Sequence, residues 1–368
     1  MTDFASRPAF APRLPWRTIA VALLALALIV GAALAYVGSQ QRHLPAPFGI
    51  ARNGVVAYDQ DGLLYTYDLE TGTSRALTSV PDRWEAPWFS GDGTRLVMAR
   101  ELSPTKVEFG VMPATGGEVT TVTTEPVAAL GTAEFSPDGR TLMVDANVDL
   151  VPSLVVMDLE AGTMRTLDIG VPAERPSFRP LDGGEILFAS RVGDNTFDVY
   201  LANADGSDLR KLYASTDEAF VFDKPLFSPD GSQVAFSIWD DAARHAQVHV
   251  VNADGTGLRR VAPDDLANAA DPVWSPDGRR LAVARWFDGG RTRIAFIDPR
   301  DGTITETDID VTDGAAKEWA PDGTSLFVSP NDEQHKPLPQ VLVDPVDGTY
   351  SMAPWTGRSY PSWQRLAP

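Results

Sequence analysis

The 368-residue sequence contains no cysteine and only four histidines. The absence of cysteine excludes disulfide bonds, thiolate metal sites, a cysteine nucleophile and a lipid-modified N-terminal cysteine. The sequence also lacks the Gly-x-Ser-x-Gly motif of α/β-hydrolases, a phosphate-binding loop and a dinucleotide-binding fingerprint. We therefore predict that the protein binds no cofactor, and that its stability comes from packing alone.

Two of the histidines, His245 and His249, have the i, i+4 spacing of a zinc pair on a helix. Their segment reads as a strand, because Val248-His249-Val250-Val251 is rich in β-branched residues. Four residues along a strand span about 13 Å, which is too far for one metal ion. The sequence therefore predicts no metal site.

Positive charge is scarce, since 31 Lys and Arg stand against 50 Asp and Glu and give a formal net charge of −19. A field of this sign repels phosphate backbones. Nucleic acid is therefore not an expected partner.

The N-terminal region contains one long uncharged segment. Residues 19–37 are all apolar, Gly or Tyr, and a helix of this length spans about 28 Å, close to the thickness of a bilayer core. Arg7, Arg13 and Arg17 precede the segment, which favours a cytoplasmic N-terminus. We predict a cytoplasmic tail over residues 1–17, a transmembrane anchor over 18–38 and a linker over 39–49. A cleaved signal peptide is the alternative, because Ala33-Leu34-Ala35 resembles a cleavage site.

A short motif repeats through the rest of the chain at intervals of 46, 43, 49, 47 and 45 residues. A repeat length near 45 is typical of one four-stranded propeller blade. The copies are Ser90-Gly91-Asp92-Gly93, Ser136-Pro137-Asp138-Gly139, Arg179-Pro180-Leu181-Asp182-Gly183, Ser228-Pro229-Asp230-Gly231, Ser275-Pro276-Asp277-Gly278 and Ala320-Pro321-Asp322-Gly323.

The residues of this motif favour a tight turn between two strands. Pro fixes φ near −65° at the second position, Asp suits the third, and Gly accepts a positive φ at the fourth. An aromatic residue precedes each copy and an alternating apolar segment follows it, as in Trp274 and Leu281-Ala282-Val283-Ala284. The repeated Asp residues are thus explained by turn formation and are not catalytic candidates.

The two ends of the repeat region predict how the ring closes. The segment Val55-Val56-Ala57-Tyr58 has no aromatic turn before it, whereas Tyr360-Pro361-Ser362-Trp363 resembles the start of a repeat and then the sequence ends. If the last segment pairs with the first, the ring has no free edge. Six internal turns and this closing segment predict an all-β fold, a seven-bladed β-propeller of four-stranded antiparallel blades over residues 50–368.

These phrases resemble the repeats of the TolB-like β-propeller family, in which Trp-Ser-Pro-Asp-Gly precedes one strand and Asn-Ala-Asp-Gly follows the next. Ser275-Pro276-Asp277-Gly278 and Asn252-Ala253-Asp254-Gly255 carry the likeness, which covers about residues 50–368. The family's namesake has six blades and an additional α/β domain, whereas only about 46 residues precede the ring here. The resemblance therefore implies the propeller fold, and not that protein's role in the cell envelope.

Strand direction predicts which face of the ring binds a partner. The Pro-Asp-Gly and Asn-Ala-Asp-Gly turns emerge on one face and are uniform, whereas the opposite face carries longer and more diverse connections, where recognition is usually built. These connections are Asp82-Arg83-Trp84, Asn147–Pro152, Arg191–Thr196, Ser215–Phe222, Trp239–His245, Ala262–Ala270, Trp286–Arg291 and Pro330–Leu338.

Tryptophans in these connections are the candidate contacts, since rigid aromatics with a polar atom are common at interfaces. Trp239-Asp240-Asp241 and Trp286-Phe287-Asp288 occupy equivalent positions in adjacent repeats, so we expect them to lie side by side. Together with Trp84 they predict an aromatic and acidic surface for a basic or glycan partner. The structural alternative is that these tryptophans pack against the ring.

The sequence favours a non-catalytic recognition protein, a single-pass protein of the cytoplasmic membrane with its propeller on the outer side. Its partner would be a protein, a peptide or an envelope polymer such as a glycan. Two alternatives remain: an enzyme like the propeller lactonases and hydrolases, with a divalent ion in the central channel, and a structural subunit of an envelope complex. The enzyme requires carboxylates near the channel, for which Glu134 and Glu318 are the candidates.

Overall fold

The computed structural model describes residues 49–79, 83–123, 127–261, 267–287, 291–311, 316–330, 338–355 and 361–367. The chain divides into two compact units, residues 1–43 and residues 44–368, and the described residues all belong to the second. The predicted tail (1–17), anchor (18–38) and nearly all of the linker (39–49) lie outside the described residues. Within the described ranges, no helix is long and apolar enough to cross a membrane.

Every regular element in the described ranges is a β-strand, and five of the sheets have four strands each. One of them is β29 (Ser362–Leu366), β1 (Arg52–Gln60), β2 (Leu63–Asp68) and β3 (Thr73–Ala76). The next along the chain is β4 (Glu85–Phe89), β5 (Arg95–Ser103), β6 (Lys106–Pro113) and β7 (Thr120–Thr121). It is followed by β8 (Ala128–Phe135), β9 (Thr141–Val148), β10 (Val151–Asp158) and β11 (Thr163–Thr166).

The last two four-stranded sheets lie in the C-terminal part of the chain, where β29 also begins. One is β21 (Asn268–Trp274), β22 (Leu281–Trp286), β23 (Thr292–Ile297) and β24 (Ile304–Val311). The other is β25 (Ala316–Trp319), β26 (Leu326–Ser329), β27 (Val341–Val343) and β28 (Tyr350–Met352).

The remaining sheet has nine strands and joins two repeats. The first repeat contributes β12 (Glu174–Phe178), β13 (Glu185–Gly193), β14 (Thr196–Asn203) and β15 (Arg210–Tyr213). The second contributes β17 (Leu226–Phe227), β18 (Gln233–Asp240), β19 (His245–Asn252) and β20 (Arg259–Arg260). Between them β16 (Ala219–Val221) pairs with both β14 and β18.

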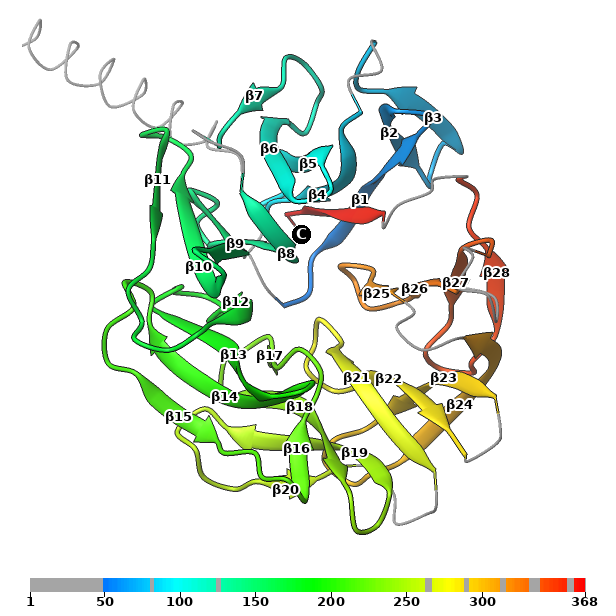
Figure 1. Ribbon diagram of the computed structural model, residues 1–368. Helices are drawn as coiled ribbons and strands as arrows, with labels where there is room; N and C mark the ends of the chain where they lie inside the picture. The colour runs from blue at the N-terminus through cyan, green and yellow to red at the C-terminus, as the bar shows by residue number, and fades with distance from the viewer. Residues whose placement is uncertain are drawn as a thin grey trace, which may run out of the picture. The chain divides into compact units, whose positions relative to one another are not determined.

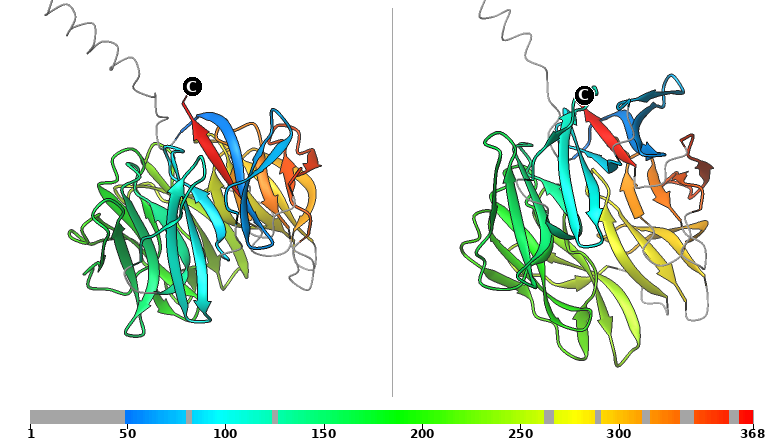
Figure 2. Two further views of the ribbon diagram at one scale, coloured as in Figure 1. Left: turned by 90° about the horizontal axis from the view of Figure 1, so that it is seen from above. Right: turned by 45° about the horizontal axis from the view of Figure 1, so that its top comes forward.

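The prediction of four-stranded antiparallel units is therefore confirmed, whereas the count of seven blades is not. Because β16 connects two repeats by hydrogen bonds, the described strands form six sheets rather than seven. Figure 1 shows these sheets following one another in chain order around a common centre, and in the views of Figure 2 their strands run between the two faces of the ring.

The predicted closure is confirmed, because β29 pairs with β1 in the register Val56↔Trp363 and Ala57↔Ser362. The Glu318 side chain of the neighbouring sheet accepts a hydrogen bond from the Trp363 amide at 3.1 Å. The Trp363 ring is 4% exposed and meets the Trp355 ring edge-on at 6.3 Å. The last described strand is thus held by backbone pairing and by burial.

The aromatic residue before each turn packs between neighbouring sheets. Trp274 and Trp319 are buried, and each donates its indole N–H to a carbonyl of the preceding repeat, Leu226 at 3.2 Å and Val273 at 3.1 Å. Each of these two tryptophans therefore contributes an apolar surface and a hydrogen bond, which together fix one sheet against the next.

The repeated tetrapeptides form the tight turns that the sequence predicts. In Ser228-Pro229-Asp230-Gly231 the Gly231 amide donates to the Ser228 carbonyl at 2.8 Å, and Gly231 has a φ of 69°. The Asp230 carboxylate accepts hydrogen bonds from the Ser228 hydroxyl at 2.6 Å and from the Ser232 amide at 3.0 Å. The assignment of the repeated Asp to turn formation is confirmed here. We call the side of the ring that carries these turns the turn face, and the opposite side the loop face.

Candidate functional site

The tryptophans predicted to lie side by side line one pocket on the loop face. Trp239 is near the end of β18 and Trp286 is the last residue of β22, and both border a cavity of about 390 Å³. Both side chains are half-buried. We call this cavity the aromatic pocket. It is lined by Asn195, Phe220, Phe222, Trp239, Ala270, Asp271, Ala284 and Trp286.

The short strand β16 adds a second pair of aromatic rings to the pocket. In the pairing of β16 with β18, Phe220 lies directly opposite Trp239, and such cross-strand neighbours are in side-chain contact range. Phe222 follows two residues later. The link between two repeats therefore also builds one wall of the site.

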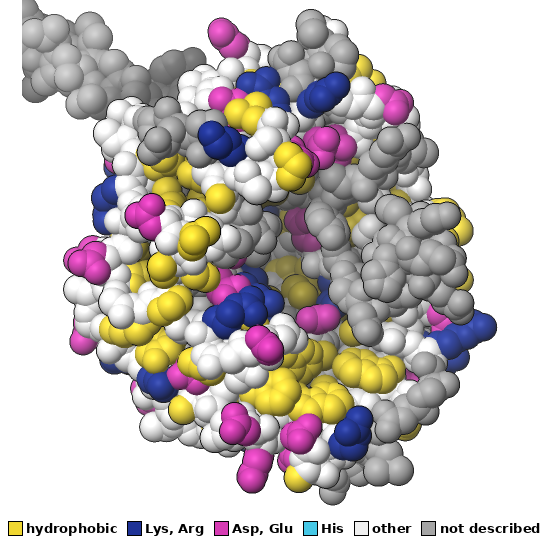
Figure 3. Space-filling model, viewed as in Figure 1, with side chains coloured by type: hydrophobic (Ala, Val, Ile, Leu, Met, Phe, Trp, Pro, Cys, Tyr) yellow, Lys and Arg dark blue, Asp and Glu magenta, His cyan; other side chains and the backbone are white. Residues whose placement is uncertain are grey.

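Two alanines leave the space that the aromatic rings surround. Ala270 on β21 and Ala284 on β22 are cross-strand partners, and each is 2% exposed. Because each ends at Cβ, their pairing leaves a hollow beside Trp286. Figure 3 shows hydrophobic side chains gathered over β16, β18 and β21 on this face, with acidic side chains beside them.

Asp271 is the one charged residue among the described residues that line the aromatic pocket. It lies at a β-bulge between Ala270 and Val273 and has a φ of 53°, which is uncommon for a residue other than glycine. Its amide donates to the Asp223 carboxylate at 3.2 Å, and the same carboxylate accepts a bond from the Ser237 amide at 2.9 Å. Asp223 thus holds the backbone conformation that places Asp271 at the pocket.

The environment of Asp223 changes its protonation. Burial, followed by the neighbouring Asp271 carboxylate, raises the pKa of Asp223 to about 7, against the effect of its hydrogen bonds. Burial also lowers the pKa of Lys317, and Asp271 and Asp223 oppose that change. Two carboxyl groups and one amine therefore interact beside the pocket, and one carboxyl titrates near neutral pH.

An arginine orders the segment that carries Phe222. The Arg175 guanidinium donates to the Phe222 carbonyl at 2.8 Å and lies 4.2 Å from the centre of the Phe197 ring. Arg191 lies over the same ring at 4.7 Å and forms an ion pair with Glu174 at 3.1 Å. These contacts fix the backbone on one side of the aromatic pocket.

The other predicted site residues have different surroundings. Asp240 and Asp241 are exposed at the end of β18, where Asp240 accepts a bond from the Ala243 amide and Asp241 one from the Trp239 indole at 3.5 Å. Trp84 is 3% exposed, with the Arg100 guanidinium 4.4 Å from its ring, so it is part of the core and not of the surface. Asp288 lies outside the described residues.

The sequence analysis did not identify Phe220, Phe222, Asp223 or Asp271 as site residues. Phe220 and Phe222 are within the predicted loop-face connection Ser215–Phe222, and Asp223 directly follows it, so two aromatics beside an acid were a visible signal. For Asp271 the sequence contains no such signal, because its place depends on the bulge and on the hydrogen bond that its amide donates to Asp223, a residue 48 positions away.

The two carboxylates considered for a channel metal have protein partners. Glu134 forms an ion pair with Lys224 at 3.1 Å, and Glu318 accepts bonds from β29. In the described ranges, no group of three or more His, Asp or Glu residues is arranged to hold a metal ion.

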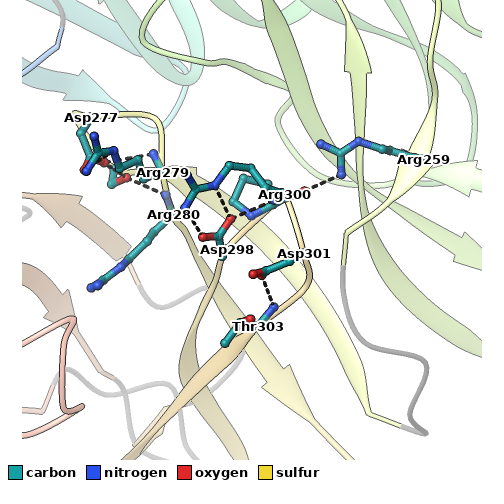
Figure 4. Close-up of polar contacts among 10 residues, drawn as sticks. Arg259, Asp277, Arg279, Arg280, Asp298, Arg300, Asp301 and Thr303 are labelled. Carbon is teal, nitrogen blue, oxygen red and sulfur yellow. Dashed lines mark hydrogen bonds and ion pairs between the residues drawn. The ribbon is translucent and has the colours of Figure 1, made fainter.

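The turn face is built from different contacts. Figure 4 shows arginines around one of its corners, where Arg259 donates to the Pro299 carbonyl. The Arg280 side chain donates to the Pro345 carbonyl. Arg300 pairs with Asp298 through two nitrogens, and this hydrogen bonding lowers the pKa of Asp298 to about 2. Here charged side chains connect one repeat to the next.

Comparisons with known proteins identify relatives of the fold. No family model matches the chain. An uncharacterized protein of Agrobacterium fabrum is 28% identical over 210 residues, which are 53% of this chain and 64% of that protein. TolB from Acinetobacter baumannii superposes with a TM-score of 0.54 at 16% identity, covering 86% of this chain and 81% of TolB.

Enzymes are also among the structural neighbours, which corrects one prediction. Oligogalacturonate lyase from Vibrio parahaemolyticus has a TM-score of 0.62 at 16% identity, covering 84% of this chain and 94% of the lyase. A puromycin-hydrolyzing peptidase of Mycobacterium tuberculosis has a TM-score of 0.55 at 15% identity over 87% of this chain and 58% of the peptidase. The prediction that this protein is not an enzyme was therefore wrong as an inference from its fold, since the same fold occurs in enzymes. At these identities the likeness concerns the fold alone, a β-propeller that this chain has in common with TolB, the lyase and the peptidase.

Proposed function

We propose that this chain is a membrane-anchored recognition protein whose propeller binds a protein, a peptide or an envelope polymer in the aromatic pocket. The carrying observation is the pocket itself, in which Trp239 and Trp286 from two sheets border one cavity of about 390 Å³. Ligand sites are typically apolar hollows of this size with a few polar groups at fixed positions.

The scaffold around the pocket supports this proposal. Phe220 and Trp239 are held opposite each other by strand pairing, and Asp271 is held by Asp223. Side chains that are already fixed lose little conformational entropy when a ligand binds. The pocket is therefore suited to recognition without rearrangement.

The proposed membrane location is based on the apolar residues 18–38 and on the arginines before them. A reporter fused after residue 368 should behave as an exported domain, because the positive charges favour a cytoplasmic N-terminus. A cytoplasmic signal from that fusion contradicts the proposal. A mature N-terminus at Tyr36 would instead indicate a cleaved signal peptide.

Substitution of the two tryptophans tests the pocket. Once a ligand has been isolated from envelope extract, Trp239→Ala and Trp286→Ala should each weaken its binding by about 1–3 kcal/mol in a calorimetric titration. Both side chains are half-buried at the surface, so the circular dichroism spectrum should not change. The matched control is Tyr350→Ala, an aromatic residue that is 50% exposed on β28. Equal loss in the control, or no loss in either tryptophan variant, contradicts the assignment.

An enzymatic role is the second candidate, and Asp223 beside Asp271 favours it. Burial raises the pKa of Asp223 to about 7, so its carboxyl group can give or accept a proton at neutral pH. Its neighbour Asp271 borders the pocket. Asp271→Asn should then abolish turnover of a bound ligand while leaving its binding measurable. Unchanged chemical integrity of the ligand after incubation with the wild-type protein opposes this role.

A further inference from the structure

We infer that the aromatic pocket receives a cationic side chain, the guanidinium of an arginine or the ammonium of a lysine, from a peptide segment of the partner. The inference rests on the proposed function and names the class of ligand. It follows from three features of the described residues: the rings, the charge inside the pocket and the charge around its rim.

The rings favour a cation over a neutral or negative group. Four aromatic side chains, Phe220, Phe222, Trp239 and Trp286, line the pocket. The face of an aromatic ring carries a negative partial charge, and tryptophan attracts a cation most strongly. A guanidinium can also stack flat on such rings, which an anion cannot do favourably.

The charges inside the pocket have the same preference. Asp271 borders the cavity, and no Lys or Arg is among the described residues that line it. Behind it, Asp223 and Lys317 interact with Asp271; burial raises the pKa of Asp223 to about 7, so the charge offered to a ligand is that of Asp271, which borders the cavity. A carboxylate in a partly enclosed apolar site binds a guanidinium more strongly than the same pair does in water.

Acidic residues also surround the entrance. Asp240 ends β18 and Asp241 follows it, and Glu218 is next to them because its carbonyl accepts the Asp241 amide at 2.8 Å. Asp217 and Asp194 are exposed on the adjoining turns, the latter next to Asn195. Arg244 is the exposed basic residue on the same turn as Asp241, and the exposed Arg191, near Asn195, is paired with Glu174. This excess of acids suits a segment with further basic residues beside the bound one.

A peptide matches these features better than an envelope polysaccharide. A neutral sugar could stack on the aromatic rings and donate a hydroxyl hydrogen bond to Asp271, but it would make no use of the charge of Asp271 and of the acidic rim. A negatively charged polymer would be repelled by both. A cavity of about 390 Å³ also suits one long side chain with part of its backbone.

The test compares peptides that differ in one charge. The full chain in mild detergent is titrated by calorimetry with a seven-residue basic peptide carrying a central arginine, and with the same peptide carrying citrulline, which has nearly the same shape and no charge. We expect the citrulline peptide to bind about tenfold more weakly, which corresponds to about 1.4 kcal/mol. Asp271→Asn should weaken the arginine peptide about tenfold and change the citrulline peptide little. Trp239→Ala should weaken both.

The possible outcomes separate this inference from the proposed function. Equal binding of the arginine and citrulline peptides, or no binding of the arginine peptide at millimolar concentration, overturns the inference. A neutral oligosaccharide is the third probe, and if it binds in a Trp239-dependent way while the arginine peptide does not, the inference fails and the proposed function stands. If no probe depends on Trp239 or Trp286, both fail.

Discussion

The turn face and the loop face use aspartate in opposite ways. On the turn face, burial acts against ionisation of Asp230, but hydrogen bonds from Ser228 and Ser232 outweigh it and lower the pKa of Asp230. On the loop face, burial and the neighbouring Asp271 raise the pKa of Asp223 to about 7. The same residue type is therefore a stabilising turn residue on one face and a titratable group beside a pocket on the other.

The difference reflects what each face requires of its backbone. A turn of four residues satisfies its own donors and acceptors locally, so its aspartate is surrounded by amide and hydroxyl donors. The loop-face pocket combines segments from several strands, and its buried aspartate holds a strained residue in place. The turn face thus keeps its aspartate ionised through local hydrogen bonds, whereas the loop face holds a buried carboxyl group whose pKa is raised.

Removal of the closing strand should have the largest effect on stability. Because it opens the ring, it should disrupt both faces together. Deleting residues 361–368 removes β29, leaves the edge of β1 unpaired and exposes Trp355. We expect aggregation or loss of cooperative unfolding in thermal denaturation and size-exclusion chromatography. If the truncated chain unfolds like the full one, the closure is not needed for stability.

Two single substitutions, one on each face, should have smaller effects than the deletion. The one on the turn face should lower stability and the one on the loop face should weaken binding. Asp230→Ala removes the acceptor for Ser228 and Ser232 and should lower the free energy of unfolding by about 1–2 kcal/mol, with ligand binding unchanged. Trp239→Ala should weaken binding and leave stability nearly unchanged. Denaturant titration of both variants measures this, with Asp308→Ala as control because the Asp308 side chain is 96% exposed. The comparison breaks if Asp230→Ala affects binding as strongly as Trp239→Ala does.

The pH dependence of stability should differ in sign between the faces, and this is the smallest effect. The pKa of Asp223 is about 7 in the folded protein and about 3.9 in the unfolded chain, so the stability that it contributes is complete below about pH 4 and lost as the pH rises through about 7. The wild type should therefore lose free energy of unfolding between pH 5 and pH 8 through Asp223, whereas Asp223→Asn should not. The stability of the variant relative to the wild type should rise over this range.

Asp230→Asn is the matched variant on the turn face. The pKa of Asp230 is lowered, so its contribution is present above about pH 4 and is lost as the pH falls through the lowered value. The variant should be less stable than the wild type at neutral pH, and this difference should shrink in acid. Denaturant unfolding at pH 3, 5 and 8 checks both variants, and equal pH profiles contradict the contrast between the faces.

The sequence by itself determined the features that depend on local chemistry. Ser228-Pro229-Asp230-Gly231 and its copies specify their own turns, because each donor and acceptor finds its partner within five residues. Their spacing predicted four-stranded units, and the unfinished last repeat predicted the pairing of β29 with β1. The equivalent positions of Trp239 and Trp286 in neighbouring repeats likewise placed them at one pocket.

Tertiary structure alone decided the features that depend on contacts between repeats. β16 joins two repeats into one sheet of nine strands, and Trp84 is buried under Arg100 although its sequence position matches the exposed connections. The bulge at Asp271 is fixed by Asp223, a residue of the preceding repeat. Such contacts join residues far apart in the chain, and whether they form depends on the packing of whole sheets, which no local pattern specifies.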